Sequence, residues 1–125
     1  MISTTLVLEK SASEREQAIA NEISTADPPF RKTAVLLEGL ASGKSPLESK
    51  NNVVVVRIAA GCLCCSSNMI MRIYLNRLIA QKPQQLFLSL STATHLEQIQ
   101  QFLSTPDYQQ HLLLTKVLNL NAIIT

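Results

Sequence analysis

Three cysteines within four residues are the part of this chain best suited to chemistry. Cys62, Cys64 and Cys65 follow Gly61, directly after an apolar run that ends at Ile58. In a strand the first two thiols would face away from the third, but in the turn that Gly61 permits all three sulfurs can converge. Converging thiolates suit Zn²⁺ or Cu(I), with a fourth coordination position for water or another side chain. The alternative is that these thiols pack as small apolar groups.

Two further side chains are weaker candidates for a fourth metal ligand. Glu38 closes an apolar run and could bind a metal or orient a water as a base, and the alternative is a solvated loop carboxylate. His95 follows the apolar run 86–90 and could bind a metal, and the alternative is a polar residue beside the start of a helix. All of these candidates lie at or after the end of a predicted strand. Parallel α/β sheets bind their ligands at the carboxyl ends of the strands, so this is where a site is expected.

Length and composition predict one soluble globular domain over residues 1–125. The chain is 46% hydrophobic and 16% charged, which is enough apolar material for a core. A formal net charge of +2, scattered basic residues and few aromatic residues argue against nucleic acid as a partner. No apolar run approaches the ~20 residues that cross a bilayer, so we expect no membrane partner. An odd number of clustered cysteines suits the reducing cytoplasm, where we expect the protein to reside.

Apolar runs alternate with helical segments along the chain. Strands are expected at residues 4–8, 33–38, 53–58, 86–90 and within 117–124. The first helix is expected to start with Ser13 as its cap and Glu16 in a capping box. Two more helices are expected, from Ser66 or Ser67 to about Gln81 and over 94–103, the former with a buried face of Ile70, Ile73, Tyr74, Leu78 and Ile79. The continuously apolar strands predict a mostly parallel, open, three-layer α/β sheet covered on both faces.

The order of these features resembles a known family. The segment Gly61-Cys62-Leu63-Cys64-Cys65 looks like the GCxCC signature in the amino-terminal GTPase domain of the CobW-like family of P-loop metallochaperones. The run 34–38 resembles the strand that ends in the family's Asn-Glu pair, with only the Glu present, and 86–91 sits where the family has a strand closing in an acidic residue and a Ser-Gly pair. The resemblance spans nearly the whole chain. It implies a P-loop NTPase-like fold and a metal ion as partner.

The chain departs from this family where nucleotide would bind. The family has a glycine-rich loop ending in Gly-Lys-Thr or Gly-Lys-Ser, whose backbone N–H groups and lysine contact the phosphates. That place here reads Glu9-Lys10-Ser11-Ala12-Ser13-Glu14-Arg15-Glu16, which contains no glycine. Glu14 and Glu16 suit the helix dipole but oppose a phosphate, and Ser89 or Leu90 replaces the acidic residue that would help to hold Mg²⁺. We therefore expect a degenerate domain that does not hydrolyse nucleotide and binds it weakly or not at all.

One segment competes for the phosphate-loop role and supports a rival function. The segment 39–45 ends in Gly43-Lys44-Ser45 after a predicted strand, but it is one residue short of the phosphate-loop spacing. Pro46 and the start of the next strand leave room for barely two helical turns, which favours a flexible loop. An active NTPase using this segment is one alternative. Another is an inert structural module that pairs with a second copy or another protein through apolar surface.

Overall fold

The computed structural model describes residues 2–9, 11–24, 32–38, 52–58, 69–90 and 96–120. Their strands are β1 (Ile2–Leu8), β2 (Thr33–Glu38), β3 (Val53–Ile58), β4 (Gln85–Leu90) and β5 (Leu112–Asn119). Their helices are α1 (Ala12–Ser24), α2 (Met69–Ala80), α3 (Leu96–Leu103) and α4 (Pro106–Gln109). The strands form one sheet in the order β3-β2-β4-β1-β5, and each neighbouring pair is parallel. The predicted three-layer α/β fold is therefore confirmed.

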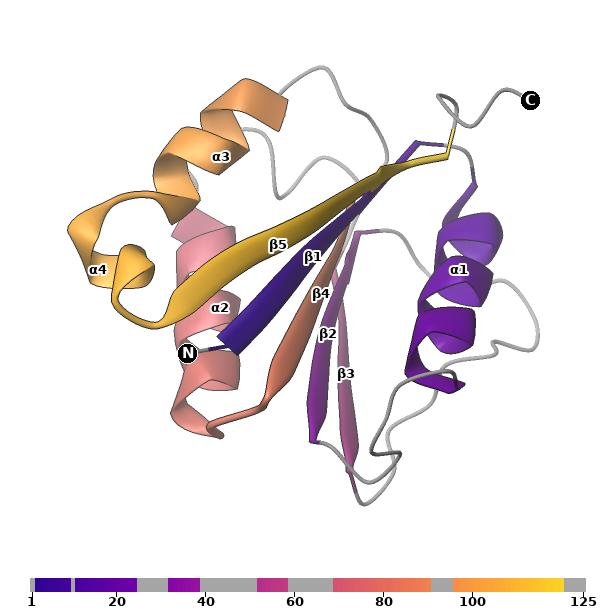
Figure 1. The fold of residues 1–125 in the computed structure, drawn as a ribbon, viewed down its shortest axis with the longest axis horizontal. Helices are drawn as coiled ribbons and strands as arrows, with labels where there is room; N and C mark the ends of the chain where they lie inside the picture. The colour runs from indigo at the N-terminus through magenta and orange to yellow at the C-terminus, as the bar shows by residue number, and fades with distance from the viewer. Residues whose placement is uncertain are drawn as a thin grey trace.

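Helices cover both faces of the sheet. Figure 1 shows α1 on one face and α2, α3 and α4 on the other. Successive strand residues point to opposite faces, so Leu6 and Leu88 belong to the core under α2 and α3, whereas Val7 and Phe87 belong to the core under α1. β2 is buried along its whole length, as its apolar sequence predicts. The same prediction is wrong for β3, which lies at an edge of the sheet and is half-buried between Val53 and Ile58.

The strand register brings several strand ends to one edge of the sheet. Leu8 of β1 pairs with Leu90 of β4, and Leu37 of β2 pairs with Ser89. Glu38 of β2 pairs with Ile58, the last residue of β3, from which the chain continues toward the cysteines. The carboxyl edge thus gathers the segments that follow β1, β2, β3 and β4, and this is where such sheets place their ligands.

The predicted cap of the first helix is wrong by two residues. Helix α1 begins at Ala12, and the Ser11 hydroxyl accepts a hydrogen bond from the Glu14 backbone N–H at 3.2 Å. Ser11 is therefore the cap and Ser13 is inside the helix. Glu16 does not close a capping box on Ser13, because its carboxylate is buried against β3, where it pairs with Arg57.

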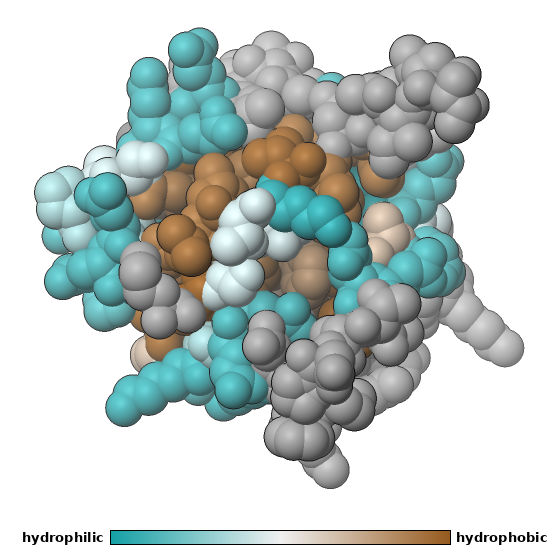
Figure 2. All heavy atoms as spheres, in the orientation of Figure 1, coloured by the Kyte–Doolittle hydropathy of each residue, from teal (hydrophilic) through white to brown (hydrophobic). Residues whose placement is uncertain are grey.

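The last strand lies about five residues earlier than predicted. It covers Leu112–Asn119 instead of 117–124, because its apolar start pairs with β1 from Ile2 onward. The short helix α4, which the sequence analysis did not expect, precedes it. Because β5 is one of the two edge strands of the described sheet, its apolar residues Leu113, Leu114 and Val117 are partly exposed. Figure 2, in the orientation of Figure 1, shows apolar side chains interrupted by polar ones on the side of the molecule that faces the viewer.

Helix α2 buries a narrower face than predicted. Leu75 and Leu78 are buried and Tyr74 and Ile79 are half-buried, but Ile73 is 44% exposed. Two positions along a helix differ by ~200° in direction, so Ile73 points away from the sheet when Leu75 faces it. No helix in the described part of the chain is long and apolar enough to cross a membrane.

Candidate functional site

A buried arginine occupies the carboxyl edge of the sheet at the start of α1. Arg15 is only 2% exposed. Its Nε donates to the Ser89 hydroxyl at 2.7 Å, and its Nη2 donates to the Glu38 backbone oxygen at 2.8 Å. Its Nη1 donates to the Glu9 backbone oxygen at 3.3 Å. One guanidinium therefore joins the ends of β4 and β2 to the residue that follows β1.

Opposing effects act on the charge of Arg15. Burial lowers its pKa below the ordinary value, and the carboxylates of Glu38, Glu16 and Glu9 act in the opposite direction by stabilising the cation. An arginine stays protonated in proteins because its ordinary pKa is so high. The buried cation is therefore compensated by carboxylates of the same domain.

The neighbouring residue makes a second contact between α1 and the sheet. The Glu16 carboxylate accepts a hydrogen bond from Arg57 Nη2 at 2.9 Å, with side-chain exposures of 3% for Glu16 and 23% for Arg57. Arg57 is on β3, one residue before the strand ends at Ile58. The start of α1 is thus tied to the strand that leads to the cysteine segment.

Of the predicted site residues, Glu38 is described and the others are not. Glu38 ends β2 and is buried, so its interpretation as a solvated loop carboxylate is wrong. The cysteines at 62, 64 and 65, His95 and the segment Gly43-Lys44-Ser45 lie outside the described residues. Within the residues that are described, no group of three or more His, Cys, Asp or Glu side chains could hold a metal ion.

Sequence reasoning missed the two arginines. A usable signal was present for Arg57, since it is the single charged residue in the otherwise apolar strand Val53–Ile58 and such a residue needs a partner when half-buried. Arg15 gave a weaker signal, because it stands among three glutamates where an exposed helix start would look the same. Only the packing of α1 on the strand ends distinguishes a buried arginine from one at an exposed helix start.

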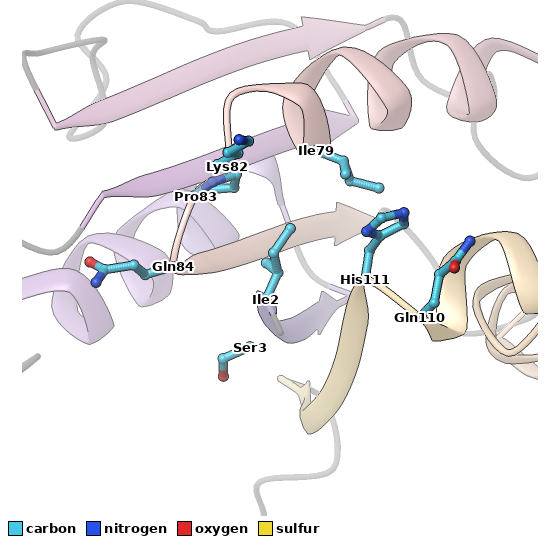
Figure 3. A pocket seen from close by; sticks show the side chains of 8 residues that line it. All are labelled: Ile2, Ser3, Ile79, Lys82, Pro83, Gln84, Gln110 and His111. Carbon is cyan, nitrogen blue, oxygen red and sulfur yellow. The ribbon is translucent and has the colours of Figure 1, made fainter.

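A hollow of about 560 Å³ lies at the opposite edge of the sheet, where β1, β4 and β5 begin. Ile2, Ile79 and Pro83 supply its apolar lining, and Lys82 and His111 are among its polar residues. Figure 3 shows the Gln84 side chain pointing away from Ile2 and His111, so the polar groups do not converge on one point. This hollow is separate from the carboxyl edge that carries Arg15.

Comparison with known proteins agrees with this geometry. A family model described as the nucleotide-binding domain of CobW/HypB/UreG matches residues 1–122. The chain belongs to the CobW/HypB/UreG family. The resemblance carried by the cysteine segment is confirmed at the level of the family, and the parallel sheet is consistent with the P-loop NTPase-like fold of this GTPase-like metallochaperone family. A search of curated proteins found no match, and neither did a search of solved structures.

Proposed function

We propose that this CobW-like domain binds a thiophilic metal ion through its cysteines and does not hydrolyse nucleotide. The observation that carries the proposed absence of nucleotide hydrolysis is the burial of Arg15 at the phosphate-loop position. The eight residues Glu9 to Glu16 stand in the place of G-x-x-x-x-G-K-[ST], which puts Arg15 at the lysine and Glu16 at the residue that would contact Mg²⁺.

The residues at this position do not fit a nucleotide phosphate. A phosphate loop aims a lysine ammonium and several backbone N–H groups at the ligand. Here the cation donates to the Ser89 hydroxyl and to two backbone oxygens, and the hydroxyl expected next to it is a buried carboxylate, Glu16. Glu9 has a left-handed backbone (φ 75°), which glycine adopts most readily, and α1 begins three residues later at Ala12, so helix occupies part of the segment where a phosphate loop would wrap its ligand.

The fourth strand supports the same proposal. Ser89 or Leu90 stands where a family member would have an acidic residue near Mg²⁺; Leu90 has no ligand atom, and Ser89 is buried and accepts a hydrogen bond from Arg15. A serine hydroxyl already used in this way is a poor substitute for a carboxylate that helps to hold a hard cation. Positioning of Mg²⁺, which phosphoryl transfer requires, therefore has no evident source in β4.

The metal half of the proposal is supported by the cysteines and by their family. Cys62, Cys64 and Cys65 would be the ligands, and their thiolates favour Zn²⁺ or Cu(I) over hard cations. Glu38 or His95 would be a weaker fourth ligand. Glu38 lies at the appropriate edge, but its carboxylate also stabilises the Arg15 cation, which weakens its candidacy. We also place the protein in the cytoplasm, where thiols stay reduced.

Metal analysis tests the cysteine site. The full chain, purified without chelator and kept reduced, is expected to bind about one Zn²⁺ or Cu(I), with affinity falling as pH falls because protons compete for the thiolates. The variant with Cys62, Cys64 and Cys65 all changed to Ser is expected to lose this binding. Thiols that react slowly even after chelator treatment, together with no metal uptake by the reduced wild type, would eliminate the site.

Calorimetry with GTP and ATP, each with Mg²⁺, tests the nucleotide half. We expect no binding in the micromolar range, because the contacts available to a phosphate are too few to offset ordering of the ligand. Lys44→Ala is the control variant. Micromolar affinity that this substitution abolishes would favour the rival NTPase that uses Gly43-Lys44-Ser45.

A further inference from the structure

Two adjacent side chains tie the start of α1 to three strands and to the residue that follows a fourth. Arg15 contacts Ser89 in β4, the end of β2 at Glu38, and Glu9 directly after β1. Glu16 contacts Arg57 in β3. In a phosphate-loop domain, the residues at these two positions instead contact the phosphates and Mg²⁺. In this chain, both side chains are instead engaged by groups at the carboxyl edge of the sheet.

We propose that the contacts of Arg15 and Glu16 with the sheet are an internal substitute for contacts with nucleotide and magnesium, and that they hold α1 on the sheet edge without any ligand. In this proposal the oxygens of Ser89, Glu38 and Glu9 take the role of phosphate oxygens as acceptors for the cation, and the Arg57 guanidinium takes the role of a metal cation as the partner of Glu16. The inference rests on the proposed loss of nucleotide hydrolysis, but it adds a positioning role to named residues. We call Arg15, Glu16, Arg57 and Ser89 the α1 clamp.

The chemistry of the clamp requires a guanidinium. Arg15 uses three nitrogens to reach three acceptors in different segments, which a single lysine ammonium does less well than the planar guanidinium fork. Removing the side chain would leave the buried Ser89 hydroxyl without the donor that it uses here, and would remove a cation that the nearby carboxylates stabilise. The start of α1 is thus expected to depend on this one group.

The first test is rescue of Arg15→Ala by a small guanidinium ion. The substitution is expected to lower the midpoint of thermal unfolding by about 10 °C, as for other losses of a buried charge partner. Methylguanidinium at about ten times its Kd for the vacated site is expected to restore about 5 °C. Sodium chloride at the same concentration controls for ionic strength. Arg77→Ala, which removes an exposed arginine stacked over Tyr74, controls for loss of an arginine and is expected to shift the midpoint by less than about 3 °C.

A second measurement covers the case in which Arg15→Ala does not fold. In the wild type, the amide hydrogens of residues 15–19 and at the end of β2 are expected to exchange slowly without ligand, and to be unchanged by GTP with Mg²⁺. Fast exchange that becomes slow only when GTP and Mg²⁺ are added would overturn the clamp. Rescue no better with methylguanidinium than with sodium chloride would also overturn it.

The two proposals can fail separately. GTP binding that Lys44→Ala abolishes would contradict the proposed function while leaving the guanidinium rescue intact. Absence of rescue in a folded Arg15→Ala variant would contradict the clamp while leaving metal binding by the cysteines untouched.

Discussion

Two glutamates of α1 offer a comparison in which the chemistry is matched and the burial differs. Glu16 pairs with Arg57 at 2.9 Å, and Glu22 pairs with Lys116 at 2.8 Å. Glu16 is 3% exposed and Glu22 is 33% exposed. Glu16→Gln and Glu22→Gln each remove one negative charge with almost no change in shape. We expect the first to destabilise the protein strongly and the second hardly at all.

The expected magnitude follows from burial. Two unit charges about 4 Å apart interact by about 4 kcal/mol at the effective dielectric constant near a protein surface. Arg57 is 23% exposed, so water screens part of this energy, and glutamine keeps a neutral hydrogen bond. We therefore expect Glu16→Gln to lower the free energy of unfolding by about 2 kcal/mol. The exposed pair of Glu22 is expected to contribute less than about 0.5 kcal/mol.

Urea unfolding followed by far-ultraviolet circular dichroism measures both changes. For a domain of this size, 2 kcal/mol lowers the urea midpoint by roughly 1 M, and the slope of the transition should not change. Charge removal in both pairs changes net charge equally, so a long-range charge effect would shift both midpoints alike. Equal midpoints for Glu16→Gln and Glu22→Gln would refute the argument that the buried contact with β3 fixes the start of α1.

Three further substitutions test other parts of the structure. Leu88→Ala, in the central strand, is expected to lower the free energy of unfolding by about 3 kcal/mol in urea, because Leu88 is fully buried. Tyr108→Phe removes a hydroxyl that donates to Asn76 Oδ1 at 2.9 Å and is expected to cost about 1 kcal/mol at neutral pH. Burial raises the pKa of Tyr108, so the unfolded chain loses this proton first as pH rises above about 10, and wild-type stability falls there. In urea unfolding at a series of pH values, the midpoint of the phenylalanine variant should fall less. Lys82 has φ 54°, where glycine is favoured, so Lys82→Gly is expected to raise the free energy of unfolding by up to about 0.5 kcal/mol and the thermal midpoint slightly. A lower midpoint would contradict this.

The sequence predicted the first four strands well because their signal is local. Runs such as 33–38 and 53–58 are mostly apolar, so both are recognisable as strands from composition alone. Burial on both faces holds for β2, whereas β3 lies at an edge of the sheet and is half-buried between Val53 and Ile58. The fifth strand was displaced because its position depends on a partner. Its apolar start at Leu112 pairs with Ile2, more than a hundred residues away, and no local pattern contains that information.

The same limit explains the candidate site. The cysteine segment was visible because its three thiols are adjacent in sequence, and its metal site stays a prediction. Arg15 was not singled out, since its partner Ser89 is 74 residues distant and each residue alone looks ordinary. The glutamates at the helix start indicated only that a phosphate would be disfavoured there. The packed structure was needed to show that Arg15 is buried at this position and contacts the strand ends.

The strand order has a consequence for how this chain must be made. Of the strands in the described sheet, β1 is synthesised first, yet its two neighbours, β4 and β5, are the last of them to leave the ribosome. Of the neighbouring pairs in that sheet, β2 and β3 alone are consecutive in sequence. Parallel pairings between distant segments form slowly and leave apolar strands open to wrong partners in the meantime. A growing chain that ends before about residue 85 therefore holds β1 without either of its neighbours in the sheet, so we expect the sheet to be completed only after β4 and β5 have been made.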